Sequence, residues 1–392
     1  MVSELATNAN PAGHAGQLRS LVTLSPIRPE RRAALRRRLA FVSLAPGGDR
    51  PLLDLSTIHF ARWSIVTQLP HPDGSGRPRR LSWAYLLFAA AYDGGEREYL
   101  DAFTDTLPQR IQKVFGGCVG FQARVEEAAG ADGPRFPAWA FRRFVECNLL
   151  PELGFAAADP SATVEAIRQA IAIERVDRRS TGLRGEALGR AQVRVEGLAL
   201  GPPAGRPGVR DAVLAPLARR ARRRPGIRPL TLAVPLAPGR EPPPAARLAE
   251  ALRALPDTHV ARLSRIPRTM QDHLGQLHPD QLPVDYLLLT TDHDGEPAPY
   301  AEAVRTQAGD AADTLFGACA AYPGAAEARD FRAWMDRHRL RTDYTVTGHP
   351  PRTVAELDRL VGDRARIARW TLEGPLPPAP RRTADAAGRR AG

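Results

Sequence analysis

The chain has 392 residues, of which 43% are hydrophobic and 25% are charged, and its net charge is +12. This composition is typical of a soluble protein with room for two domains, while three cysteines exclude a disulfide framework or a zinc site. The longest apolar run, 84–92, is too short to span a membrane and the N-terminus has no signal-peptide pattern, so we expect a cytoplasmic protein.

The first half of the chain alternates strand and helix patterns. Runs of β-branched and aromatic residues predict strands, and Pro29 suits the first turn of a helix. Asp93, with Glu96 three residues on, is typical of a capping box, so one helix should start there and end before Gly116. The predicted order is strand 21–24, helix 30–40, strands 57–67 and 81–92, helix 96–115, an inserted helix 137–149, a final strand 153–157 and helix 163–175.

The second half repeats this order, which indicates an internal duplication. Tyr85, Asp93, Tyr99 and Cys118 lie in motifs that recur at an offset of 201 residues, and the segment around His59 recurs at an offset of 200. The second set of elements is predicted at 230–236, 245–255, 258–266, 285–291, 295–317, 331–339, 344–347 and 354–368.

The duplication predicts both the domain organisation and the fold class. We expect a disordered N-terminus at 1–16, repeat one at 17–176, a Pro/Gly/Arg-rich linker at 177–228, repeat two at 229–373 and a disordered tail at 374–392. Each repeat has the β-α-β-β-α order that a last strand completes to a ferredoxin-like unit. The predicted fold is therefore α+β, with two tandem ferredoxin-like repeats packed as a pseudo-dimeric α+β barrel with extra helices.

Two fused units of this kind resemble the dimeric α+β-barrel superfamily. Dye-decolorising peroxidases and chlorite dismutases are similar in having two such units in one chain, and this resemblance implies haem binding. Antibiotic-biosynthesis-type monooxygenases and muconolactone-isomerase-like proteins are similar in building the barrel without haem. The chain keeps only Asp-Gly of the dye-decolorising family's Gly-x-x-Asp-Gly signature, at Asp93 and Asp294. Residues 57–63 also resemble a segment of uncharacterised bacterial proteins, which implies no chemistry.

Two residue pairs are candidates for a site. His59 and His259 hold equivalent strand positions, and so do Arg62 and Arg262. Because side chains alternate along a strand, either the histidines or the arginines should line the interior of the barrel. Neutral imidazole suits an axial haem ligand or a general base, and a guanidinium suits a carboxylate or a haem propionate.

Each candidate also has a structural interpretation. A strand histidine can be satisfied by a hydrogen bond alone, and an arginine by a salt bridge or by laying its stem over apolar surface. Asp93 and Asp294 are expected to cap the helices that follow them rather than to act as catalytic acids. His293 and His338 are expected to be exposed.

The leading hypothesis is an oxidoreductase-like protein that binds a small-molecule ligand inside the barrel. It would be either haem-binding and peroxidase-like or cofactor-free and monooxygenase-like, with His59 or His259 as base or haem ligand and Arg62 or Arg262 as anion clamp. The alternative is a non-catalytic binding or scaffold protein of the same fold.

The basic surplus favours an arginine-rich solvated surface, because Lys113 is the only lysine among 55 basic residues. No pattern for reading nucleic-acid bases accompanies it, so we expect no specific nucleic-acid partner. Arg219–Arg224 could still make a weak electrostatic contact with an acidic partner or a membrane surface.

Overall fold

The structure is a computed structural model that describes residues 18–44, 57–121, 138–179, 226–270, 276 and 278–373. The predicted segments 1–16 and 374–392 and most of the predicted linker 177–228, with Arg219–Arg224, lie outside the described residues. The two ends of that linker belong to regular elements, because helix α7 (Val164–Arg179) extends into it and strand β5 (Ile227–Pro235) begins within it.

Two four-stranded antiparallel sheets form the centre of the molecule, which confirms the predicted α+β class. The first sheet has the strand order β1-β3-β2-β8, and the second has the order β4-β6-β7-β5. Besides β5, the strands are β1 (Leu18–Ile27), β2 (Ile58–Pro70), β3 (Pro78–Asp93), β4 (Glu152–Ala157), β6 (Thr258–Ile266), β7 (Tyr286–Asp294) and β8 (Tyr344–Thr347).

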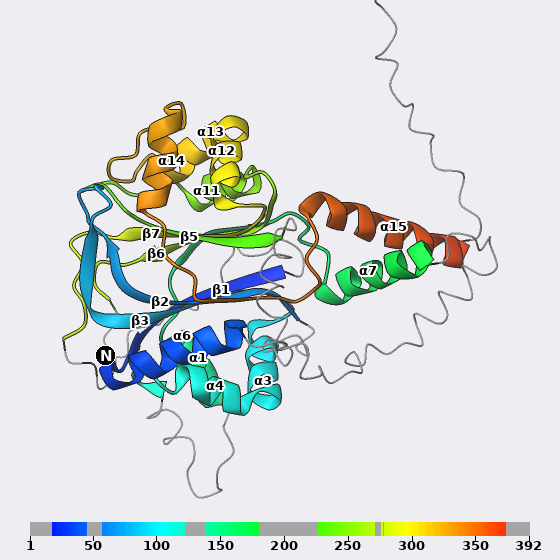
Figure 1. Ribbon diagram of the computed structural model, residues 1–392, viewed down its shortest axis with the longest axis horizontal. Coiled ribbons are helices and arrows are strands. Elements are labelled where there is room, and N and C mark those ends of the chain that lie inside the picture. The colour runs from blue at the N-terminus through cyan, green and yellow to red at the C-terminus, as the bar shows by residue number, and fades with distance from the viewer. Residues whose placement is uncertain are drawn as a thin grey trace, which may run out of the picture.

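Helices cover the outer face of each sheet, so the molecule has four layers (Figure 1). The helices beside the first sheet are η1 (Pro29–Arg31), α1 (Arg32–Leu44), α3 (Glu96–Thr106), α4 (Pro108–Phe115) and α6 (Ala138–Glu146). Those beside the second are α11 (Ala245–Arg253), α12 (Pro297–Gln307), α13 (Gly309–Phe316) and α14 (Ala328–Arg337). Helices α7 and α15 (Val354–Glu373) pack on each other and project from one end of the sheets (Figure 1).

The two outer cores differ in their side chains. Aromatic residues crowd the core between the first sheet and its helices, among them Trp63, Phe88 and Phe103. Leucine and alanine dominate the corresponding core of the second sheet. Since the two halves share one arrangement of elements, the difference in side-chain size changes how closely the helices can approach.

The last strand of each half joins the sheet of the other half. Strand β4 was predicted to complete repeat one, but it pairs antiparallel with β6 of the second sheet, with Phe155 opposite Arg262. In the same way β8 pairs with β2, with Thr345 opposite Arg62. The predicted strand therefore forms, but its predicted partner was wrong. The pattern of a strand predicts which face is buried and does not predict which edge it will join.

The single helix predicted at 96–115 is two helices, α3 and α4. Leu107 separates them with a backbone φ of −132° and ψ of 38°. A proline disfavours the helical conformation of the residue before it, and Pro108 begins the second helix. The repeat-two helix predicted at 295–317 breaks at the equivalent Ala308, where φ is −137° and ψ is 37°.

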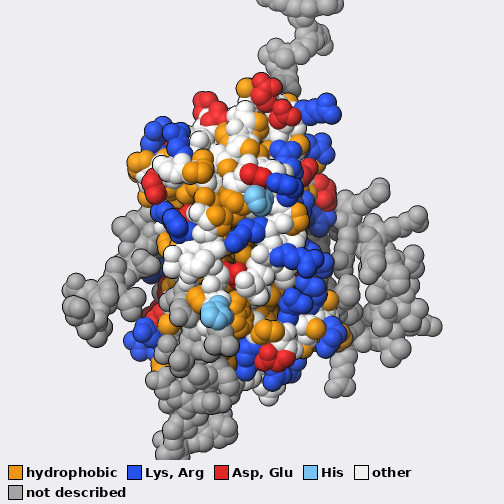
Figure 2. Space-filling model, turned by 90° about the vertical axis from the view of Figure 1, so that its left-hand side faces the viewer, with side chains coloured by type: hydrophobic (Ala, Val, Ile, Leu, Met, Phe, Trp, Pro, Cys, Tyr) orange, Lys and Arg blue, Asp and Glu red, His pale blue; other side chains and the backbone are white. Residues whose placement is uncertain are grey.

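Basic side chains are dispersed over the face of the molecule in Figure 2, where they lie among hydrophobic and acidic side chains from top to bottom. Several exposed arginines have local acidic partners, such as Arg305 with Glu302, whose nearest nitrogen and oxygen are 2.6 Å apart. In the part of the chain that the structure describes, no helix is both long and apolar enough to cross a membrane.

Candidate functional site

Each predicted histidine binds the aspartate at the end of the neighbouring strand. His59 Nε2 lies 2.8 Å from Oδ1 of Asp93, and His259 Nε2 lies 2.9 Å from Oδ1 of Asp294. The register of β2 against β3 shifts on either side of His59, and the register of β6 against β7 shifts in the same way around His259. Both histidines therefore sit in β-bulges, which redirect a side chain and break the simple alternation used for the prediction.

The second oxygen of each aspartate starts a distant helix. The backbone N–H of Val164 donates to Oδ2 of Asp93, and that of Val354 donates to Oδ2 of Asp294, both at 2.8 Å. The aspartates cap α7 and α15, so the prediction that they cap the helices directly after them was wrong. Of those helices, α3 has Gly95 at its N-cap and α12 has Glu296, and neither has a side-chain capping bond there. Each His-Asp pair thus ties a strand end to a projecting helix.

These contacts favour a structural role for both histidines. Their side chains are only 4% and 3% exposed, for His59 and His259 respectively. Nε2 of each imidazole meets a carboxylate, and neither residue lines the two cavities described below. A carboxylate partner is also common for a histidine that ligates a metal through its other ring nitrogen, so haem ligation stays a prediction.

The arginines face the opposite sheet. Arg62 Nη1 donates to the carbonyl of Leu230 and Nη2 donates to the carbonyl of Thr291, both at 2.7 Å. Nη2 also pairs with Asp292 at 2.6 Å. Arg262 lies on the same inner side of its own sheet, but it has fewer partners. Both arginines point between the sheets, and Arg62 links one sheet to the other. The two alternatives for the interior do not exclude each other, because the ring of His259 also meets Phe60 of the first sheet, with ring centroids 5.5 Å apart.

The two histidines that were expected to be exposed are buried. His293 stacks on Tyr300 with ring centroids 3.8 Å apart, and burial lowers its pKa to about 3. His338 Nδ1 donates to the carbonyl of Trp334 at 2.8 Å. Both predictions were wrong because a local pattern does not show tertiary packing. Tyr300 of the following helix α12 covers His293, and Trp334 of the preceding helix α14 packs on His338. Within the described residues no cluster of histidine, cysteine, aspartate or glutamate could hold a metal ion.

A cavity of about 360 Å³ lies on the outer side of the first sheet, between α1 and α4. Its aromatic lining consists of Phe41, Trp63, Phe103, Phe115 and Tyr344, and we call it the aromatic pocket. Trp63 stacks between Phe88 and Tyr344, with ring centroids 4.9 and 5.3 Å away. Its indole Nε1 is buried and has no hydrogen-bond partner among the described residues. A buried donor of this kind is costly unless it finds an acceptor.

Basic residues border the aromatic pocket. Arg38 of α1 and Arg110 and Lys113 of α4 belong to its lining. Arg38 Nη1 donates to the carbonyl of Lys113 at 2.7 Å, which joins the two helices at the border. Phe41, also on α1, is 72% exposed. The pocket therefore combines an apolar interior with cationic groups and an unusually exposed aromatic ring.

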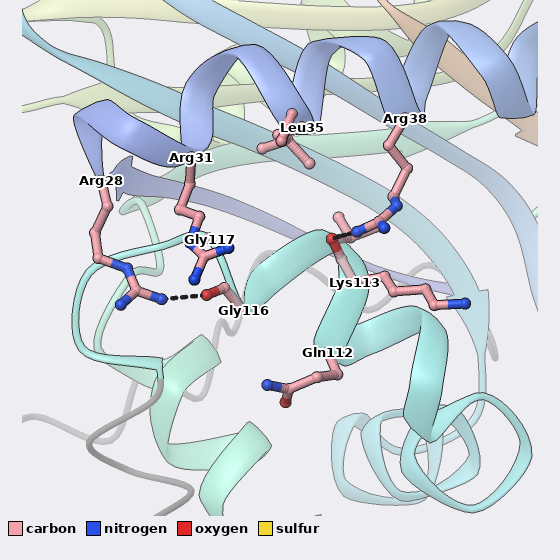
Figure 3. Close-up of a pocket in the computed structure, with 10 residues that line it drawn as sticks. Arg28, Arg31, Leu35, Arg38, Gln112, Lys113, Gly116 and Gly117 are labelled. Carbon is pink, nitrogen blue, oxygen red and sulfur yellow. Dashed lines mark hydrogen bonds between the residues drawn. The ribbon is translucent and has the colours of Figure 1, made fainter.

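A second cavity of about 290 Å³ adjoins the first, and both are lined by Arg38, Lys113 and Val114. We call it the cationic groove, because Arg28 and Arg31 also line it. Figure 3 shows these two arginines pointing from the start of the first helix toward the end of α4. One nitrogen of Arg28 donates to the carbonyl of Gly116 (Figure 3). The guanidinium groups thus partly satisfy the carboxyl end of α4 and partly face the groove.

The second half lacks the counterpart of the aromatic pocket's lining. Strand register places Leu263 where repeat one has Trp63, and Gly154 where it has Tyr344. A Cβ atom on Gly154 would lie 3.1 Å from Leu252 of α11, so no side chain larger than hydrogen fits there without movement. Because Leu263 and Gly154 are smaller than Trp63 and Tyr344, α11 can lie directly on the sheet.

The helices that cover the two sheets also differ between the halves. Helices α4 and α13 correspond at an offset of 201 residues, which aligns Arg110 with Ala311 and Lys113 with Thr314. Helix α11 packs extensively on α13 and β4, whereas α1 makes few contacts with α4 and β8. Repeat one keeps a pocket because its aromatic side chains hold α1 away from the sheet.

Sequence reasoning did not find this pocket. The difference between Trp63 and Leu263 was visible as divergence between the repeats, but Tyr344 lies in the other half of the chain and reaches the pocket only through the exchange of β8. Comparison with known proteins adds no assignment, since no protein-family profile and no curated protein matches this chain.

Proposed function

We propose that the protein is a non-catalytic binding protein that holds one amphiphilic anion in the aromatic pocket. The observation that carries this proposal is the asymmetry between the halves. The same scaffold is filled by small side chains in the second half, while in the first it surrounds a cavity of about 360 Å³ bordered by Arg38, Arg110 and Lys113. Such a divergence between two copies of one unit favours a ligand site in the copy that has the aromatic lining and the basic border.

The chemistry of the lining defines the ligand class. Stacked rings such as Trp63 and Tyr344 favour a flat or flexible apolar body. The basic border favours a carboxylate, sulfonate or phosphate head group. The volume lies at the lower end of the range of about 300–1,000 Å³ for small-molecule sites, so the body should be a short alkyl chain or one or two aromatic rings.

A binding role is favoured over an oxidoreductase role by the residues at hand. The described lining of the pocket contains no histidine, carboxylate or thiol that could act as a general acid, a general base or a nucleophile. The oxidoreductase hypothesis places its chemistry at His59 and His259, which are engaged with aspartates. That hypothesis stays a prediction, and titration with hemin tests its haem-binding form.

We further propose that the whole scaffold is a pair of tandem ferredoxin-like repeats packed as a pseudo-dimeric α+β barrel. Three features support it: the constant offset between α3 and α12 and between α4 and α13, the two sheets with equivalent strand orders, and the reciprocal exchange of β4 and β8. In this arrangement each half completes the other's sheet, so the pocket of repeat one depends on Tyr344 from repeat two.

The stoichiometry of binding tests the proposed function. Purified protein is titrated calorimetrically with 1-anilinonaphthalene-8-sulfonate and, separately, with decanoate, which share an apolar body and an anionic head. We expect one site per chain for each, and competition between the two. Two equivalent sites per chain, or no saturable binding of either probe, contradicts a pocket confined to the first half.

A further inference from the structure

Arg262 is a fully buried arginine with few partners. It is 0% exposed, and its Nη1 donates to the hydroxyl of Thr290 at 3.3 Å. Its Nε and Nη2 have no hydrogen-bond partner among the described residues. Its acidic partner is Asp292, whose Oδ2 lies 3.8 Å from Nη2. Nε and Nη2 form one edge of the guanidinium, so the edge that suits a bidentate acceptor is the one left open.

Arg62, which holds the equivalent position in the first sheet, shows which hydrogen-bond acceptors Arg262 lacks. Arg62 uses the hydroxyl of Thr231 and the carboxylate of Asp292, in addition to two carbonyls. Strand register places Val22 at the position equivalent to Thr231, and Ala91 at the position equivalent to Asp292. The two side-chain acceptors that satisfy Arg62 are therefore replaced by apolar groups on the side that Arg262 faces.

No carboxylate among the described residues lies within hydrogen-bond distance of the Nε–Nη2 edge of Arg262. Asp292 pairs with Arg62 at 2.6 Å and lies 3.8 Å from Arg262. Glu152 also favours the charged form of Arg262, without a hydrogen bond to it. Burial lowers the pKa of Arg262 to about 10, so it stays charged at neutral pH. A buried guanidinium whose N–H groups lack acceptors carries a large desolvation cost.

We propose that a small planar oxyanion of the carboxylate or bicarbonate class binds between the two sheets at the Nε–Nη2 edge of Arg262, in place of the side-chain carboxylate that Ala91 lacks. Such an anion accepts two parallel N–H bonds and places a counter-charge directly at the open edge. Ser264, two residues along the same face of β6, adds a buried hydroxyl that has no partner among the described residues. This site is independent of the aromatic pocket and does not rest on the proposed function.

Thermal unfolding tests the proposal in a series of buffers of constant ionic strength, in which sodium chloride is replaced stepwise by sodium formate. A ligand that binds only the folded state raises Tm with its concentration. We expect a rise of about 2 °C for each tenfold increase in formate above half-saturation, and a similar rise in bicarbonate. An unchanged Tm across the formate series overturns the proposal. In a second experiment each salt is added to the buffer by itself, and a rise of Tm in chloride equal to that in formate also overturns it.

Two variants locate the anion. Arg262→Met removes the charge, so its Tm should no longer depend on formate. Ala91→Asp supplies a carboxylate at the position equivalent to Asp292, so it should also lose the dependence and should raise Tm in formate-free buffer. If Ala91→Asp does not fold, the result for Arg262→Met decides alone. Formate dependence that persists in Arg262→Met contradicts binding at this residue.

Discussion

Tyr344 stacks on Trp63 across the two halves of the chain, with ring centroids 5.3 Å apart and ring planes inclined by 28°. Tyr344 belongs to β8, which pairs with β2 of the first sheet. The exchange of this strand is what completes the aromatic pocket. Ligand binding in the first half should therefore depend on residues from both halves.

Trp63 should contribute stacking to the ligand. Trp63→Phe keeps a ring but reduces the stacking surface, so affinity for 1-anilinonaphthalene-8-sulfonate should fall by about twofold to fivefold. Trp63→Leu should weaken binding further, because the stacking surface is lost. Calorimetric titration measures both.

The matched control for Trp63→Leu is Trp139→Leu, since Trp139 is 43% exposed and does not line the aromatic pocket. We expect this variant to bind the probe as the unaltered protein does. If both substitutions weakened probe binding equally, the probe would be responding to a general property of the fold and not to the aromatic pocket.

Lys113 should attract the anionic head group. Lys113→Thr introduces the residue found at the equivalent position of α13, so we expect an intact fold, weaker binding of decanoate by about threefold to tenfold, and a smaller dependence of affinity on salt. Arg329→Thr removes one positive charge from an exposed position of α14 and serves as control. The prediction fails if the two variants lose affinity to the same extent.

His59 and His259 should matter for stability and not for ligand binding. His59→Ala leaves one oxygen of the partly buried Asp93 without its partner, and His259→Ala does the same to Asp294. Each should lower the free energy of unfolding by about 1–3 kcal/mol, as measured by urea denaturation. Loss of a hemin-induced Soret band in either variant would instead support the oxidoreductase hypothesis.

Buried histidines should make the protein less stable in acid. Burial lowers the pKa of His349 to about 3, from an ordinary value of 6.5. The unfolded chain takes up a proton as the pH falls below about 6.5, whereas the folded chain does so only near pH 3. The contribution of His349 is therefore fully present above pH 6.5 and is lost progressively as the pH falls toward 3, by about 2 kcal/mol at pH 5.

His349→Gln should flatten this pH dependence in urea denaturation between pH 7 and pH 5. His71→Gln is the control, because the side chain of His71 is 43% exposed on a turn. An unchanged pH profile in His349→Gln would show that other groups set the acid sensitivity. His293, whose pKa burial also lowers to about 3, should cause part of the remaining slope.

Local pattern predicted the elements because strand and helix periods are local properties. The strands around His59 and His259 and the capping role of Asp93 follow from residue type and spacing alone. The residues that these strands and this carboxylate contact could not be predicted in the same way. The carboxylate of Asp93 caps α7, which begins 71 residues later in the chain at Val164, and the bulge at His59 is set by pairing with β3.

The aromatic pocket was beyond sequence reasoning for a related reason. Its existence depends on the distance between α1 and the sheet, which the size of side chains from three separate segments determines. Gly154 and Tyr344 hold equivalent positions on the exchanged strands, and neither could be assigned to the opposite sheet from its own neighbours. The differences between Trp63 and Leu263 and between Phe88 and Leu289 were the local signs of it.

The indole N–H of Trp63 offers the most direct test of ligand binding in the aromatic pocket. The chain has five tryptophans, so a ¹H–¹⁵N spectrum of protein labelled in tryptophan should show five indole signals, with that of Trp63 assigned by its loss in Trp63→Phe. On titration with decanoate we predict that the Trp63 signal shifts saturably and by far the most, because the ring of Trp63 lines the pocket that the ligand enters. A saturating titration that leaves the Trp63 signal in place contradicts the account.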